Sequence, residues 1–213
     1  MKMPRICDEP EIGRRERRAG AMVAAAKDLF LERGYDAVSL TQIVQRSGGS
    51  LSTLYDLFGS KLGLLSAVVN AERNDDIGRL RIILSRDEPP AAILRAAAGH
   101  LLDMMADPTL VGLIRLVMGE VLTSPEFAAR IYADTHKPLI DEFSALFAQW
   151  NAEGRAQMPE PQISAHMFTA LFFHAPQMRV LFSDMRAPEV CERQQMLGRA
   201  IDMFLAGASI APD

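Results

Sequence analysis

The chain has 213 residues, of which 49% are hydrophobic and 23% are charged, and this balance is typical of a globular protein with a substantial buried core. Its apolar runs fall short of the ~18 residues that a membrane helix needs, and its polar start lacks the apolar segment of a signal peptide, so we expect a cytoplasmic protein with no membrane partner. Its two cysteines, Cys7 and Cys191, lie far apart and indicate neither a disulfide framework nor a zinc site.

The charges are distributed unevenly along the chain. Residues 1–81 contain 13 Lys and Arg against 11 Asp and Glu, which is a net +2, whereas residues 82–213 contain 10 against 16, which is a net −6. A basic cluster near the start comprises Arg14, Arg15, Arg17 and Arg18. We predict a flexible basic arm over residues 1–15. A mildly basic head on an acidic body can still bind an anion.

The first two elements are predicted to be helices. Residues 16–33 carry apolar side chains at helical spacing, and Gly34 follows as a residue that can end the helix. Ser39 stands three residues before Gln42, which is the pattern of a capping box. A short second helix is therefore expected to begin near Leu40.

A turn and two further helices follow. Gly48 and Gly49 break the second helix, and Ser50 can cap a third short helix that extends to about Phe58. A fourth, longer helix is predicted to start at Lys61 and to reach the mid-eighties.

The remainder of the chain is also predicted to be helical. After an acidic, proline-containing linker at residues 87–90, five more helices are expected, at about 91–106, 109–122, 125–153 with a kink at Pro138, 162–182 and 188–206. Alternating β-branched runs, which mark strands, are missing. The predicted fold is all-α with about nine helices, in an N-terminal three-helix domain over residues 16–76 and a larger helical domain over residues 77–213.

Residues 50–61, SLSTLYDLFGSK, place small polar side chains beside bulky apolar ones. Two short helices joined by a tight glycine turn form a helix-turn-helix, whose second helix enters the major groove of DNA. Such a helix needs small side chains near the bases, hydroxyl groups and cations for the phosphates, and an apolar back. The segment meets these requirements if Leu54 and Phe58 face inward.

Residues 16–71 resemble the DNA-binding domain of the tetracycline-repressor (TetR) family of bacterial regulators. The resemblance is carried by AAAKDLFLERGYDAVSLTQIVQRSG, by STLYDLFGSK and by the Leu-Leu pair at 64–65. It implies a helix-turn-helix over residues 39–58 that binds a double-stranded DNA operator. The residues that it places near the DNA backbone or the bases are Ser39, Thr41, Gln42, Ser50, Leu51, Ser52, Thr53, Tyr55 and Lys61.

Four positions depart from the family pattern, and one of them is Leu57, which replaces a common aromatic residue. Gly49 replaces the usual apolar turn residue, which should loosen the turn by up to ~1 kcal/mol of backbone entropy. Leu51 and Leu62 stand where charged residues are frequent. Their presence removes charge from the DNA face and predicts a modest, salt-sensitive affinity.

The same resemblance implies a pocket for a small-molecule effector among the fifth to eighth helices and a homodimer formed by the last two helices. Methionine and aromatic residues suit an adaptable apolar pocket, although most residues of this kind pack in cores. The candidates for ligand contact are Met105, Met118, Phe143, Phe147, Trp150, His166 and His174. The segment RLVMGEVLTSPEFAARIY further resembles the AefR-like branch of the family, which names no ligand.

Catalysis and bound cofactors are not expected. The four histidines, at positions 100, 136, 166 and 174, form no i, i+4 pair and have no neighbouring cysteine, so no metal site is predicted. The sequence has no nucleophile elbow, no dinucleotide-binding glycine motif after a strand and no phosphate-binding loop.

The sequence thus predicts a homodimeric repressor that leaves a palindromic operator when a small apolar or amphipathic effector binds. Two alternatives stay open. One is an activator or co-repressor-dependent regulator with the same fold. The other is a helical ligand-binding protein without a DNA function.

Overall fold

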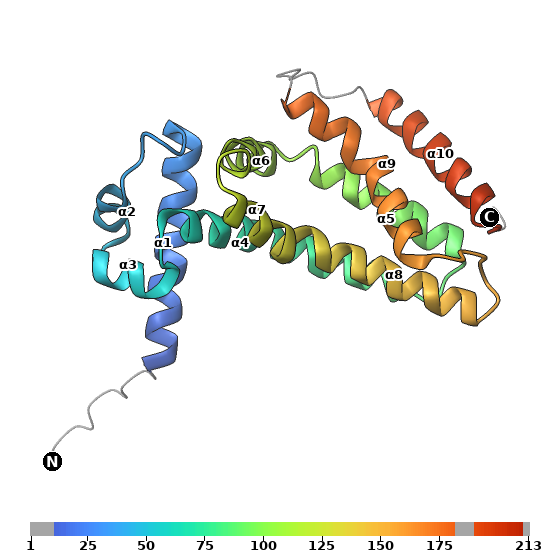
Figure 1. Ribbon diagram of the computed structural model, residues 1–213, viewed down its shortest axis with the longest axis horizontal. Coiled ribbons are helices and arrows are strands. Elements are labelled where there is room, and N and C mark those ends of the chain that lie inside the picture. Colours follow the sequence, from blue (N-terminus) through green and yellow to red (C-terminus); the bar gives the residue numbers. More distant parts are fainter. Residues whose placement is uncertain (1–10, 182–189, 211–213) are drawn as a thin grey trace, which may run out of the picture. The chain divides into compact units, whose positions relative to one another are not determined.

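The structure is a computed structural model that describes residues 11–181 and 190–210 (Figure 1). All regular structure in these ranges is helical: α1 (Glu11–Arg33), α2 (Leu40–Ser47), α3 (Leu51–Phe58), α4 (Lys61–Leu84), α5 (Pro90–Met104), α6 (Pro108–Val121), α7 (Pro125–Ile131), η1 (Tyr132–His136), α8 (Lys137–Ala152), α9 (Pro161–Leu181) and α10 (Val190–Gly207). If the continuous stretch α7–η1–α8 is counted once, the described part contains nine helical segments. The predicted all-α fold is therefore confirmed.

The chain divides into two compact units, Met1–Ala71 and Glu72–Asp213. We refer to them as the first unit and the second unit and describe each by itself. The division falls inside α4. The start of this helix, up to Ala71, belongs to the first unit, and the rest, from Glu72, belongs to the second. The sequence placed the domain boundary after residue 76, five residues further along the same helix.

The first unit packs three helices and the start of a fourth around one apolar core. Met22 and Phe30 from α1, Ile43 from α2 and Leu54 from α3 are fully or almost fully buried in it. Both α2 and α3 contact α1 (Figure 1). Because α3 is held by its inner face, its outer face remains at the surface.

The start of α1 corrects the sequence prediction. The helix begins at Glu11 rather than at residue 16, so a flexible arm is wrong for residues 11–15, and the arginine cluster lies on the helix. Residues 11–15 contain no proline, and the glutamate and arginines there are good helix formers that outweigh the ~1 kcal/mol cost of Gly13. Residues 1–10 of the predicted arm lie outside the described residues.

The second unit is built around an aromatic core. α9 packs against α8, α5, α6 and α10, and its Phe168 is fully buried. The centre of the Phe168 ring lies 4.9 Å from that of Phe143, 6.1 Å from that of Phe147 and 5.0 Å from that of Phe204. Tilted and edge-to-face ring pairs of this kind add to the stabilisation from apolar burial. They tie α8, α9 and α10 into one body.

The predicted kink at Pro138 takes the form of the π-helical segment η1. Pro138 has no N–H group, so the regular α-helical hydrogen bonds cannot continue through it. Immediately before it, the Lys137 N–H donates to the Tyr132 carbonyl, which closes a wider turn. In addition, Arg73 of α4 donates from Nη2 to the Thr135 carbonyl at 3.3 Å. This bond ties α4 to the π-helical segment.

Candidate functional site

Hydrogen bonds that the sequence predicted frame the first short helix of the helix-turn-helix. Ser39 Oγ accepts from the Gln42 N–H at 3.3 Å, and Gln42 Oε1 accepts from the Ser39 N–H at 2.7 Å. These two bonds complete the capping box. The helix ends at Gly48, which has a φ of +75° and whose N–H donates to the Val44 carbonyl at 3.0 Å. The prediction that α2 starts near Leu40 and ends at the glycines is confirmed.

The second glycine of the turn has a packing role that the sequence did not show. A Cβ atom at Gly49 would overlap the terminal methyl group of Met22, which is almost completely buried. Any larger residue at this position would have to displace that methyl group. Gly49 therefore permits a close approach between the turn and α1, in addition to the backbone flexibility expected from its type.

α3 presents one face to the core and the opposite face to solvent. Ser50 caps the helix by accepting from the Thr53 N–H at 3.1 Å. Leu54 is fully buried, and α3 contacts both α1 and α2. The side chains exposed on the outer face are Leu51, Ser52, Tyr55 and Asp56. Tyr55 is the most open of the large ones, with 53% of its surface exposed. Its phenol group therefore points away from the core.

The structure separates the nine residues predicted to contact DNA into two groups. Five make hydrogen bonds within the first unit: Ser39, Gln42, Ser50, Thr53 and Lys61. The other four have exposed side chains: Thr41, Leu51, Ser52 and Tyr55. The bonds of the first group position the two short helices, so these residues have a structural role whatever they contact on DNA. DNA contact by either group stays a prediction.

Lys61 is held at the first residue of α4. Its Nζ donates to the Tyr35 carbonyl at 2.5 Å and lies 4.2 Å from the centre of the Tyr35 ring. The Tyr35 ring in turn packs on Phe30 of α1, with 5.4 Å between the ring centres. An ammonium group carries three N–H donors, so the bond to Tyr35 is compatible with a phosphate contact. It also fixes where the charge sits.

Sequence reasoning missed two charged residues of the helix-turn-helix. Asp56 lies on the outer face of α3, four residues after Ser52, and helical spacing from the predicted DNA contacts could have identified it. Arg46 of α2 forms ion pairs of 3.3 Å with Asp28 and with Glu32 of α1. These pairs attach α2 to α1, and no local pattern indicates them because the partners are 14 and 18 residues away.

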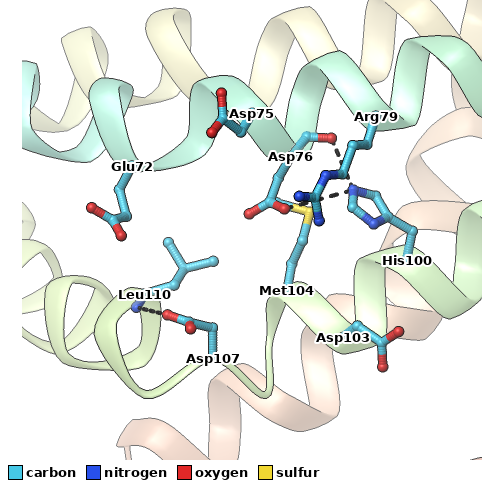
Figure 2. Close-up of a pocket in the computed structure, with 9 residues that line it drawn as sticks. All are labelled: Glu72, Asp75, Asp76, Arg79, His100, Asp103, Met104, Asp107 and Leu110. Atoms are coloured by element: carbon cyan, nitrogen blue, oxygen red, sulfur yellow. Dashed lines mark hydrogen bonds and ion pairs between the residues drawn. The ribbon is translucent and has the colours of Figure 1, made fainter.

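The second unit contains a polar cavity of about 400 Å³ (Figure 2). It is lined by residues of α4, α5 and the start of α6: Glu72, Asp75, Asp76, Arg79, His100, Asp103, Met104, Asp107 and Leu110. His100 Nε2 lies 2.8 Å from the Asp76 carbonyl oxygen, and Asp107 caps α6 by accepting from the Leu110 N–H at 2.8 Å. Because five of the lining residues are acidic and one is arginine, the cavity has an acidic character.

None of the seven residues predicted to bind a ligand lines this cavity. Phe143, Phe147 and Trp150 are buried in the aromatic core, so core packing, the alternative that the sequence left open, describes their surroundings. The remaining four are half-buried or exposed: Met105, Met118, His166 and His174. Sequence reasoning missed the cavity because it searched for apolar residues, whereas the acidic and basic residues of α4 recur there at helical spacing.

The part of the chain that the structure describes contains neither a candidate metal site nor a candidate membrane-spanning helix. No three His, Cys, Asp or Glu side chains come together there in a way that could hold a metal ion. No helix there has both the length and the apolar character needed to cross a lipid bilayer.

The geometry of α2, the turn and α3 agrees with comparisons to known protein families. Residues 22–68 match the family model of bacterial regulatory proteins of the tetR family, and residues 92–207, more than half of the chain, match that of the C-terminal domain of AefR-like transcriptional repressors. The chain belongs to the TetR family. The members of this family are DNA-binding transcriptional regulators rather than enzymes.

Two relatives of this TetR-family regulator are themselves named transcriptional regulators. FasR of Mycolicibacterium smegmatis, an activator, is 30% identical over 121 residues, which cover 57% of this chain and 55% of FasR. BdcR of Escherichia coli, a repressor, is 40% identical over 67 residues, which cover 32% of this chain and 34% of BdcR. The chain thus aligns with about half of one relative and a third of the other.

The fold of this TetR-family regulator also recurs in a solved structure. A TetR-family transcriptional regulator from Mesorhizobium loti MAFF303099 superposes with a TM-score of 0.79 at 23% identity. The match covers 91% of this chain and 98% of the other. At this identity the likeness shows that the two proteins have the same fold.

Proposed function

We propose that this regulator is a homodimeric repressor that leaves a palindromic operator when a small apolar or amphipathic effector binds. The observation that carries the proposal is the outer face of α3, which is exposed while Leu54 and the cap at Ser50 hold its back. A short helix held in this way can lie in the major groove, with its hydroxyl groups near the backbone and its first turn near the bases.

An exposed apolar stripe supports pairing through the last two helices. Ile163, Met167 and Leu171 recur every four residues along α9 and are all exposed, and α10 adds exposed Met196 and Met203. Exposed apolar patches of this kind mark interaction sites, and a twofold axis would pair each stripe with its own copy. A twofold dimer places two recognition helices ~34–36 Å apart, one turn of the duplex, which is why the operator is expected to be palindromic.

The effector is proposed to act through α4. Four residues of this helix line the cavity of Figure 2, and the same helix begins in the first unit at Lys61. Met104 and Leu110 place apolar surface beside the carboxylates, which suits an amphipathic molecule. A ligand that prefers one position of α4 would favour one spacing of the recognition helices. A coupling of ~1–3 kcal/mol would weaken operator binding about 5- to 150-fold.

Repression is favoured over activation by the match of residues 92–207 to AefR-like repressors. The activator FasR aligns with this chain over about half of the length of FasR. This similarity leaves open the alternative of an activator or a co-repressor-dependent regulator. The two differ in the direction of the ligand effect. Adding effector to a gel-shift assay should release DNA from an effector-released repressor, whereas a co-repressor would strengthen the complex.

The experiment that tests the proposal is selection of bound DNA from a random pool with the full-length protein, followed by affinity measurements at several salt concentrations. We expect an inverted repeat to be enriched. The double variant Tyr55→Phe, Lys61→Ala should weaken binding to every sequence and lower the slope of log affinity against log salt by about 1 for each lysine lost. Lys137→Ala, which removes an exposed lysine of the second unit, serves as the control. If no sequence is enriched, the chain is instead a ligand-binding protein without a DNA function.

A further inference from the structure

We propose that Leu51 reads the 5-methyl group of a thymine in each half of the operator and is thus a specificity-determining residue. The inference rests on the proposed operator binding by α3. It adds a base preference that the helix-turn-helix by itself does not specify.

Leu51 is placed for base contact by its position in the helix. It is the first residue of α3, directly after the capping Ser50, and 39% of its surface is exposed. Leu54, one turn later, is fully buried and fixes the rotation of the helix. In helix-turn-helix proteins the first residues of the second helix contact the base edges. The isobutyl group of Leu51 therefore stands where the bases are read.

In the first turn of α3 the exposed side chains are those of Leu51 and Ser52, so apolar contact with a base edge at this end of the helix falls to Leu51. The outer face carries the hydroxyl group of Ser52, the phenol of Tyr55 and the carboxylate of Asp56. A serine hydroxyl can bond to several bases, and a carboxylate can accept a bond from the amino group of cytosine. None of these exposed residues is Arg, Lys, Asn or Gln, the residues that make bidentate bonds to purines.

The chemistry of the major groove then identifies the partner of Leu51. A leucine side chain neither donates nor accepts hydrogen bonds, so it can distinguish base pairs only by apolar contact. The apolar feature of the major groove is the methyl group on C5 of thymine. Cytosine lacks this methyl group. An exposed leucine at the start of the recognition helix therefore favours thymine over cytosine at the base pair that it faces.

The test removes the methyl group without changing any hydrogen bond. Once the selected operator is known, each thymine is replaced in turn by deoxyuridine, and the affinity of the full-length protein is measured by fluorescence anisotropy at fixed salt. We expect one thymine in each half-site at which the replacement weakens binding by roughly fourfold, the effect of losing one buried methyl-sized group. In Leu51→Ala this penalty should disappear at that position and persist at any other sensitive one.

Leu31→Ala is the matched control, because Leu31 on α1 is exposed to 38%, almost the same extent as Leu51. It should keep the full deoxyuridine penalty. Two further operators replace the sensitive T·A pair by a C·G pair, one with 5-methylcytosine and one with unmethylated cytosine. Protein that contains Leu51 should bind the methylated operator more tightly than the unmethylated one. Equal deoxyuridine penalties in the wild type and in Leu51→Ala at every thymine would overturn the inference while operator binding stands. Failure to select any DNA sequence would instead overturn the proposed function, and the inference with it.

Discussion

Replacement of Met167 by glutamate should dissociate the proposed homodimer without unfolding the chain. Met167 lies in the middle of the apolar stripe of α9 and exposes 62% of its surface. In an isolated chain the substitution falls on the solvent side of a helix, where glutamate is a good helix former, so the free energy of unfolding should change by less than about 0.5 kcal/mol.

The expected loss of dimer affinity follows from the exposed area. Full burial of a methionine side chain contributes about 1.5–3 kcal/mol, and the exposed 62% of Met167 represents about 1–2 kcal/mol of this. Both subunits of a twofold dimer carry the substitution, so the interface loses this contribution twice. The total loss is about 2–4 kcal/mol, which raises the dimer Kd about 30- to 700-fold. Two carboxylates brought into the same apolar interface increase the penalty further.

Sedimentation velocity over a range of protein concentrations measures this change directly. The matched control is Ile82→Glu on α4, because Ile82 is also an exposed apolar residue, with 66% of its surface accessible, and lies outside the stripe. The control should retain the wild-type dimer fraction, while Met167→Glu sediments as a monomer and binds the operator weakly. Equal behaviour of the two variants, or a wild-type protein that is monomeric at micromolar concentration, would refute pairing through α9.

Three further predictions concern the two units themselves. Gly48→Ala should lower the free energy of unfolding in urea by about 1 kcal/mol, because residue 48 has a φ of +75°, and Gly48→Asn should cost less; equal costs would contradict a backbone cause. Phe168→Ala should cost about 3–5 kcal/mol because its ring is fully buried among aromatic rings, and a loss below 1 kcal/mol would contradict its central place in the core. Partial burial and the nearby Arg73 lower the pKa of His136. Its neutral form is therefore favoured in the folded state, and stability should fall as the pH drops below ~6.5. His136→Gln should flatten this dependence, and an unchanged pH profile would exclude His136 as its source.

The sequence by itself determined those features that depend on neighbouring residues. The capping pair Ser39 and Gln42 located the start of α2, Ser50 located the start of α3, and Pro138 located the interruption before α8. Each signal acts within one turn of the helix, through a hydrogen bond that a side chain supplies or that a proline removes. Family resemblance then extended these local features to a DNA-binding regulator, because the pattern over residues 16–71 combines them in one order.

Only the tertiary structure decided which side chains remain available at the surface. Lys61 is bonded to Tyr35, 26 residues away, and Arg46 is paired with two acidic residues of α1. Phe143, which suited a ligand pocket by its type, is packed against Phe168 in the core, and the cavity is lined instead by acidic residues of α4 and α5. Exposure and pairing depend on which helices come together in space. Residue type and spacing along one helix cannot specify them.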